Sequence, residues 1–416
     1  MSALLCLLGI QFAHATDSFT VHEWGTFTSV QGGDGQLIPW RPLKTTELPS
    51  FVYNWTNAGF GRYSTTVFPG KGDMVTLQRM ETPVIYFYSS NTLSVDVSVK
   101  FPKGIITEWY PQATQIGPSM LAATSSTTNS ATPDSIVVWK RLNVFPEGLT
   151  QQPPQLATDK SGNHYYAARE PDSDMVQIMT PGQPNPYETE KFLFYRGAGS
   201  FETPLRVTVD TNNLVSVENK GAEKLSHLFL VSIHNGVGGF AEMDGLAPGN
   251  SVLWQSLDLL DKQVLPFSIF QQMIAKQMES ALTDQGLSAP EAQAMVKTWV
   301  DSWFTEEGER LLYILPRAWT DETLPLTITP APTNLVRVMV GRAEIITPKT
   351  QQALTDSLMR ASKGDATART EAIGQLRRLG RFAEPAINFA HVQTDTNSFG
   401  YYGYGLLPDV LRPSQK

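Results

Sequence analysis

The chain is poor in the residues that cross-link proteins or bind transition metals. Its 416 residues include one cysteine, Cys6, and six histidines. A single cysteine excludes an internal disulfide and a multi-cysteine zinc site. No run of about 18 apolar residues occurs, so the sequence predicts no transmembrane helix. Charged residues make up 17% of the chain, below the usual value of about 25%.

Positive charge is also scarce. Thirty-two Lys and Arg residues face 40 Asp and Glu residues, which gives a formal net charge of −8. A nucleic-acid binder needs a basic face, so nucleic acid is not a predicted partner. The sequence lacks the GxSxG, P-loop and Rossmann glycine patterns, which argues against an α/β-hydrolase, an NTPase and a nicotinamide enzyme.

The N-terminus has the pattern of an export signal. Residues 3–12 form a short apolar run, and Ala13-His14-Ala15 matches an A-x-A cleavage site. We expect residues 1–15 to be a signal peptide, although Met1-Ser2 lacks the usual positive charge. Cleavage removes Cys6, and an exported chain without cysteine is typical of the bacterial periplasm or exterior.

Residues 16–250 have the pattern of a β-rich region. Apolar and polar residues alternate in 93–101 and in 205–209, which is the period of a half-buried strand. Turn signals at 89–91 and 211–213 separate such strands from their neighbours. Short strands about 8–12 residues apart predict an antiparallel β-sandwich-like body.

Residues 251–346 change to helical periodicity. One helix is expected to end at Gly286, and Ser288–Glu291 forms a capping box that begins another. Strands are then expected at 311–315 and 336–340. This order predicts a helical hairpin inserted before the last strands and packed on the sheet.

Residues 347–416 are predicted to be a C-terminal helical tail, with helices near 348–361 and 366–379. The fold class predicted from the sequence is therefore mainly β with α.

Three glutamates lie within apolar, aromatic strand segments. They are Glu23, Glu81 and Glu108. An unpaired buried carboxylate is unfavourable, so each is either paired with arginine or has a raised pKa that catalysis can use. Two carboxyls about 5–9 Å apart would suit glycoside hydrolysis. The candidate arginine partners are Arg62, Arg79, Arg169 and Arg196.

A second group of polar and aromatic residues is a candidate substrate-binding set. Its members are His164, Tyr166, Arg169, Tyr195, Arg196 and Trp109. Arginine can bind a carboxylate or phosphate through two hydrogen bonds, and Trp and Tyr rings suit sugar faces. The alternative is that these residues form ordinary polar clusters at strand ends.

Metal binding has a weaker basis in the sequence. HExxH and HxH motifs are absent, and the proposed ligands are His22 and His164 together with a carboxylate. The sequence requires no cofactor, and calcium or a His-ligated transition metal both stay open.

Several strings together resemble a known family. They include HEWGTFT at 22–28, RMETP at 79–83, TEWYP at 107–111 and HYYAAR at 164–169. The chain resembles a family of exported bacterial hypothetical proteins with an N-terminal HEWGTFT motif. The resemblance covers most of residues 20–350 and implies export and a bacterial source, with no activity attached.

Three functions follow as hypotheses. The simplest is an exported envelope or ligand-binding protein whose ligand is a carbohydrate or another small molecule, with its carboxylates in salt bridges. The second is a secreted carbohydrate-active hydrolase or lyase that uses paired glutamates in an open cleft. The third is a His-ligated metalloenzyme, which needs at least two imidazoles about 2 Å from one metal.

Overall fold

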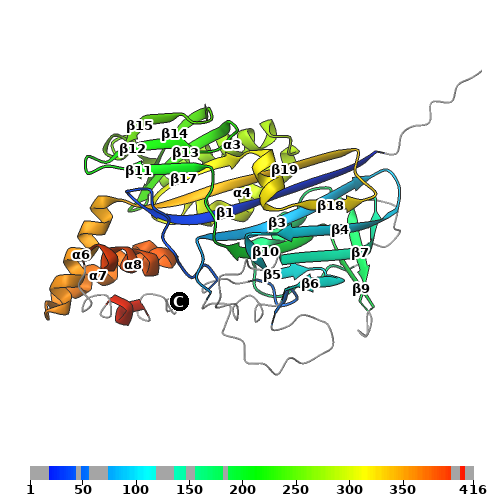
Figure 1. Cartoon of the computed structure of the whole chain (residues 1–416), viewed down its shortest axis with the longest axis horizontal. Helices are drawn as coiled ribbons and strands as arrows, with labels where there is room; N and C mark the ends of the chain where they lie inside the picture. Colours follow the sequence, from blue (N-terminus) through cyan, green and yellow to red (C-terminus); the bar gives the residue numbers. More distant parts are fainter. Residues whose placement is uncertain are drawn as a thin grey trace, which may run out of the picture.

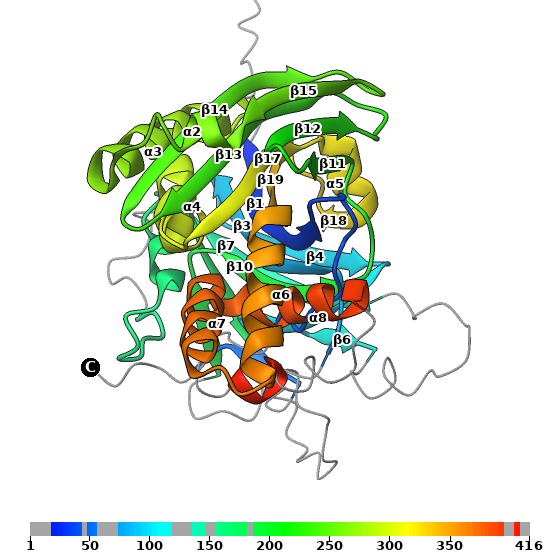
Figure 2. The same cartoon turned by 90° about the vertical axis from the view of Figure 1, so that its left-hand side faces the viewer.

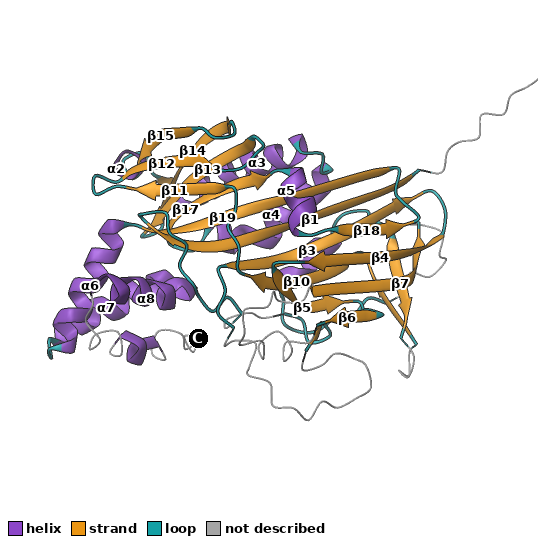
Figure 3. Cartoon of the chain, viewed as in Figure 1, coloured by secondary structure: helices purple, strands orange, loops and turns teal. Residues whose placement is uncertain are grey.

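The computed structural model describes residues 18–43, 48–55, 74–118, 135–146, 155–180, 186–394 and 403–407. Within them the fold is mainly β, with several antiparallel pairings and a C-terminal helical region (Figures 1 and 3). The predicted fold class is thereby confirmed. The predicted signal peptide, residues 1–15, and the candidate partner Arg62 lie outside the described residues.

The largest sheet of the described chain has ten strands. In spatial order they are β16 (Leu265–Pro266), β14 (Val237–Leu246), β13 (Leu225–His234), β17 (Gly308–Leu315), β19 (Asn334–Ile346), β1 (Phe19–Gly32), β3 (Gln78–Ser89), β10 (Leu193–Gly199), β5 (Gly104–Tyr110) and β2 (Tyr53–Asn54).

Two further sheets pack against this one. The second contains β18 (Leu326–Thr329), β4 (Leu93–Phe101), β7 (Ser135–Phe145), β8 (Met175–Met179) and β9 (Tyr187–Glu190), and β6 (Gln115–Gly117) pairs with β7. The third contains β11 (Leu205–Val209), β12 (Leu214–Asn219) and β15 (Ser251–Ser256). The strands predicted at 93–101 and 205–209 are confirmed as β4 and β11.

Only some of the described helices begin with a side-chain cap. They are η2 (His164–Arg169), α2 (Leu257–Leu260), α3 (Phe267–Asp284), α4 (Ala289–Phe304), α5 (Arg317–Thr323), α6 (Pro348–Ser362), α7 (Ala366–Leu379), η3 (Gly380–Phe382) and α8 (Ala383–Thr394). The capping box at α4 is present, since the Ser288 hydroxyl accepts from Glu291 N and Glu291 accepts from Ser288 N.

Strand β1 lies in the middle of the large sheet. It pairs with β3 in the antiparallel sense and with β19 in the parallel sense. The sequence pattern predicts an antiparallel body, and this parallel pair is a departure from it. A parallel neighbour needs a long crossover, and here β19 returns after about three hundred residues of intervening chain.

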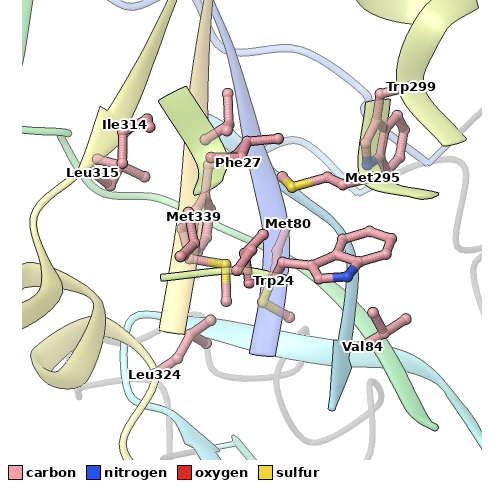
Figure 4. Close-up of a cluster of buried hydrophobic side chains, with 14 of the residues drawn as sticks. Trp24, Phe27, Met80, Val84, Met295, Trp299, Ile314, Leu315, Leu324 and Met339 are labelled. Atoms are coloured by element: carbon pink, nitrogen blue, oxygen red, sulfur yellow. The ribbon is translucent and has the colours of Figure 1, made fainter. Parts of the chain in front are cut away.

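The two faces of β1 contact different layers. His22 and Trp24 point to the same face because side chains two apart on a strand share a face. On this side α4 lies along β1, and Trp24 is buried with Met295 and Trp299 of α4 in one core (Figure 4). Phe27, on the other face, packs edge to face on Trp319 of α5, with ring centroids 5.4 Å apart.

The C-terminal helices form a small core of their own. Helices α6, α7 and α8 lie together at one end of the molecule, beyond the end of β19 (Figures 1 and 2). Leu354, Leu376, Phe382 and Ile387 are buried there with Trp40 from the N-terminal part of the chain. We call residues 348–394 the C-terminal helical region.

The capping box gives a first prediction. Ser288→Ala removes the hydroxyl that accepts from Glu291 N, so the free energy of unfolding should fall by about 1 kcal/mol in urea denaturation. Thr367→Ala is the control, because Thr367 is an exposed helical residue in α7. Equal stability changes in the two variants would contradict a stabilising role for the cap.

Candidate functional site

Glu23 is buried on β1 and is fully engaged. Its Oε1 accepts a hydrogen bond from the Tyr195 hydroxyl at 2.6 Å, and its Oε2 forms an ion pair with Arg337 Nε on the neighbouring strand β19. Arg337 also binds Asp321 of α5 at 2.7 Å. Glu23 therefore joins three elements of the fold, and its charge is neutralised.

Glu81 is buried on β3 between two arginines. Its Oε1 lies 2.6 Å from Arg79 Nε and 2.8 Å from an Arg381 amino nitrogen. Burial alone would raise the pKa of Glu81, but nearby guanidinium groups outweigh that effect and lower it to about 2. A carboxyl that stays ionised in this way is a poor general acid at neutral pH.

Glu108 on β5 is held by Arg196 of β10, the residue directly opposite it. The two residues form a two-point ion pair, with nitrogen–oxygen distances of 3.0 and 3.2 Å. All three glutamates singled out from the sequence are therefore bound to arginine. Arg79 and Arg196 were among the proposed partners, whereas Arg337 and Arg381 were not.

Glu81 and Glu108 belong to a larger group of charges, most of them buried, on the face of the sheet that α4 covers. We call it the arginine–glutamate cluster. It contains five arginines and four glutamates, which are Arg79, Arg196, Arg310, Arg342, Arg381, Glu81, Glu108, Glu306 and Glu344.

Arg342 is the most connected member of the cluster. It binds Glu344 and Glu306 at 2.7 Å each, and it donates to the Ser302 hydroxyl at 2.6 Å. Arg381 reaches the same Ser302 hydroxyl at 2.8 Å. Both guanidinium groups lie over the Phe382 ring, at 5.0 and 4.9 Å from its centroid. The cluster thus connects the sheet, the end of α4 and the C-terminal helical region.

His22 is placed against the start of α4. Its Nδ1 lies 2.8 Å from Glu291 Oε2, and Glu291 Oε1 accepts from the Tyr88 hydroxyl at 2.7 Å. Burial raises the pKa of Glu291, but its hydrogen bond to His22 helps to lower it below the ordinary value. His22 therefore anchors α4 on β1 through one ring nitrogen.

His164 is near the arginine–glutamate cluster. It packs on Trp299 of α4, with ring centroids 5.5 Å apart, and its side chain keeps solvent access. Desolvation by the surrounding protein lowers the pKa of His164, and the charges of Arg196 and Arg79 add to this effect. Glu81 acts in the opposite direction.

The other candidate binding residues make internal contacts. Arg169 binds Glu190 through both its Nε and a terminal nitrogen, and the Tyr166 hydroxyl donates to Asp159 at 2.8 Å. Tyr195 is fully buried against Glu23. Trp109 is also fully buried, with its ring 5.5 Å from that of Trp55, so it offers no exposed face for a sugar.

No metal centre is formed by the described residues. Among them, no group of three or more His, Cys, Asp or Glu side chains is arranged to hold an ion. The proposed pair His22 and His164 is not brought to one point, since His22 contacts Glu291 and His164 contacts Trp299.

A cavity that the sequence did not predict lies between the large sheet and the C-terminal helical region. Its volume is about 600 Å³. Its walls are the adjoining ends of β13, β17 and β19, together with α6 and α7. We call it the junction cavity. Its ionisable groups are the acids Asp261, Glu307, Glu309 and Glu344 and the bases His234, Lys349 and Arg378, and Ser232 adds a hydroxyl.

Two pairs of polar side chains in the junction cavity are hydrogen-bonded to each other. His234 Nε2 lies 2.7 Å from Glu309 Oε1, and this hydrogen bond raises the pKa of His234. The Ser232 hydroxyl donates to Asp261 at 2.8 Å. Serine and histidine thus bind different carboxylates, and this arrangement is not that of a catalytic triad.

Glu307 differs from the other carboxylates of this cavity. Its Oε1 accepts from the backbone amide of Asn235 at 3.2 Å. Its Oε2 is buried and has no hydrogen-bond partner among the described residues. The wall of the cavity therefore includes a carboxylate whose hydrogen bonding is only partly satisfied. Local sequence gave no signal for this site, because its walls come from segments far apart in the chain.

Comparisons with known proteins do not assign the chain to a family. No protein-family model matches it, and no curated protein matches it. One similar solved structure is the yeast delta-COP-I mu-homology domain with a Dsl1 peptide. Its identity is 7% and its TM-score 0.28, and the match covers 79% of this chain and 99% of that one.

Another is the zebrafish (Danio rerio) Fcho1 mu-homology domain with a bound Eps15 peptide. It shows 8% identity and a TM-score of 0.26, and the match covers 79% of this chain and 97% of that one. Scores this low define neither the fold nor the function of this chain. No helix among the described residues is long and apolar enough to cross a membrane.

The arginine–glutamate cluster gives a second prediction. Glu81 stays ionised in the folded protein down to about pH 2, whereas its ordinary pKa is 4.5. Its stabilising effect is therefore complete above pH 4.5 and is lost as the pH falls through about 2. Glu81→Gln should lower the free energy of unfolding by about 3–5 kcal/mol at pH 7, and much less near pH 2.

Urea unfolding of wild type and variant across this pH range measures the difference. Glu322→Gln is the matched control, because the Glu322 side chain is 75% exposed and lies 3.5 Å from Lys103. A gap between wild type and Glu81→Gln that stays constant with pH would show that the charge of Glu81 is not what stabilises the fold.

Proposed function

We propose that the chain is an exported bacterial binding protein without catalytic activity, and that it holds a small polar ligand in the junction cavity. One observation carries the proposal. The three acids that suggested catalysis are all paired with arginine, while a cavity of about 600 Å³ with ordered polar groups lies elsewhere. Small-molecule sites often lie at such junctions between structural units.

The lining of the cavity favours a ligand that donates hydrogen bonds. Carboxylates outnumber basic groups there, and Glu307 Oε2 lacks a donor among the described residues. The described lining contains no Phe, Tyr or Trp, so it offers none of the large flat rings on which sugars stack. Among small molecules, amines and amino acids fit this chemistry better than carbohydrates.

The two enzymatic alternatives have less support. A hydrolase or lyase would require Glu81 or Glu108 to act while each is bound to arginine. A His-ligated metalloenzyme would require His22 and His164 to converge. The described contacts favour neither arrangement.

Blocking the cavity tests the proposal. Ala353 of α6 lines the cavity, whereas its neighbour Gln352 is exposed and does not. We would screen amines, amino acids and neutral sugars by the shift in Tm of the full chain and measure hits by calorimetry. Ala353→Trp should abolish the shift produced by any hit, because the indole fills the ligand volume, and Gln352→Trp should retain it.

Two results would count against this function. One is the absence of any saturable hit in the three compound classes. The other is a hit whose affinity is the same in Ala353→Trp and in wild type. Turnover of a sugar polymer that is lost in Glu81→Gln or Glu108→Gln would instead favour the hydrolase alternative.

Export is tested separately. The apolar run at 3–12 and the Ala13-His14-Ala15 site support it. Expressed in a bacterium with a working secretion pathway, the chain should appear in the periplasm or medium with Thr16 as its first residue. Mass spectrometry of the intact protein measures this. A cytoplasmic product that retains residues 1–15 would remove export from the proposal.

A further inference from the structure

Arg79 on β3 is a buried cation with an incomplete set of partners. Its side chain is 8% exposed, and the one ion pair that it forms in the described chain is from Nε to Glu81 Oε1 at 2.6 Å. The two atoms are close enough for an ion pair, but their geometry is not that of a hydrogen bond. Arg79 Nε has no other hydrogen-bond acceptor among the described residues. A guanidinium group carries five N–H donors. Of these donors in Arg79, the one at Nε is buried and has no hydrogen-bond acceptor within the described residues.

The surroundings of Arg79 are rich in positive charge. Burial, together with the charges of Arg196 and Arg381, lowers the pKa of Arg79 to about 9, although Glu81 acts against this. The neighbouring carboxylates are already shared, because Glu81 also binds Arg381 and Glu108 binds Arg196. The cluster as a whole has five arginines for four glutamates.

Other donors near Arg79 also lack acceptors. Trp299 Nε1 is buried and has no hydrogen-bond partner among the described residues, and Arg381 Nε has no directed hydrogen bond there either, although it lies 3.3 Å from Glu306 Oε1. His164 packs on Trp299 and interacts electrostatically with Arg79 and Arg196. Because these unmatched groups are donors or cations, what the site lacks is negative charge and acceptor oxygens.

We propose that Arg79, with Arg196 and His164 beside it, is a binding site for a small oxyanion, the carboxylate or phosphate group of a ligand. The planar fork of a guanidinium group matches two oxygens of such an anion, and the low local dielectric strengthens the interaction. Arg79 does not line the junction cavity, so this site is distinct from the one assigned above and does not depend on it.

Titration with two simple anions tests the site. Inorganic phosphate and acetate would each be added to the full chain at pH 7, with potassium chloride holding the ionic strength constant. At least one anion should bind saturably at one site and raise Tm beyond the chloride control. Binding of phosphate alone would identify a phosphate ligand, and binding of acetate alone would identify a carboxylate ligand.

Three variants separate this site from general charge effects. Arg79→Gln should abolish the saturable binding. Arg79→Lys keeps the positive charge but loses the planar guanidinium group that can donate to two oxygens at once, so it should weaken binding at least about tenfold. Arg360→Gln is the control, because Arg360 is a half-exposed arginine paired with Asp365, and its loss should change affinity less than twofold.

His164→Gln keeps the test decisive if Arg79 variants do not fold. The His164 side chain is exposed, so the variant should retain the wild-type Tm while its anion affinity falls severalfold. The proposal is wrong if wild type binds neither anion above the chloride control. It is equally wrong if folded Arg79→Gln and His164→Gln both bind as wild type does.

Discussion

The buried pairing of guanidinium and carboxylate groups is the constraint on which this fold depends most. Moving a charge out of water costs several kcal/mol, which only a well-placed partner recovers. Arg342 illustrates the result, because it is fully buried and binds Glu306, Glu344 and Ser302 at once. Removing one partner would leave an uncompensated charge under α4. The positions of α4 and the C-terminal helical region relative to the sheet are therefore coupled.

This coupling extends to the junction cavity. Glu344 lines the cavity and also binds Arg310 and Arg342. Arg310 in turn donates to the carbonyl of Glu307 at 3.0 Å, which fixes the backbone beside the Glu307 carboxylate, whose Oε2 lacks a donor among the described residues. The residues around the cavity are already ordered. A ligand that binds there would therefore cause little further loss of conformational entropy. Glu344 thus belongs both to the ionic network and to the wall of the cavity.

The sequence predicted the local features and missed the distant ones. Alternation defined β4, and the capping box defined the start of α4, because both signals lie within a few neighbouring residues. The burial of Glu81 and Glu108 was also visible from their apolar surroundings. Arg381 was not identified as a partner of Glu81, since the two are 300 positions apart. Periodicity carries no information about such pairs, nor about a cavity assembled from several distant segments.

The HEWGTFT segment shows how residues typical of catalysis can serve structure. His22 and Glu23 are adjacent on β1, so they point to opposite faces of the sheet. His22 binds Glu291 at the start of α4, and Glu23 binds Arg337, which continues to Asp321 of α5. One dipeptide in the central strand thus fixes a helix on each side. Because both side chains are occupied by these contacts, the two binding sites that we propose use other charges, those of Glu307 and Arg79.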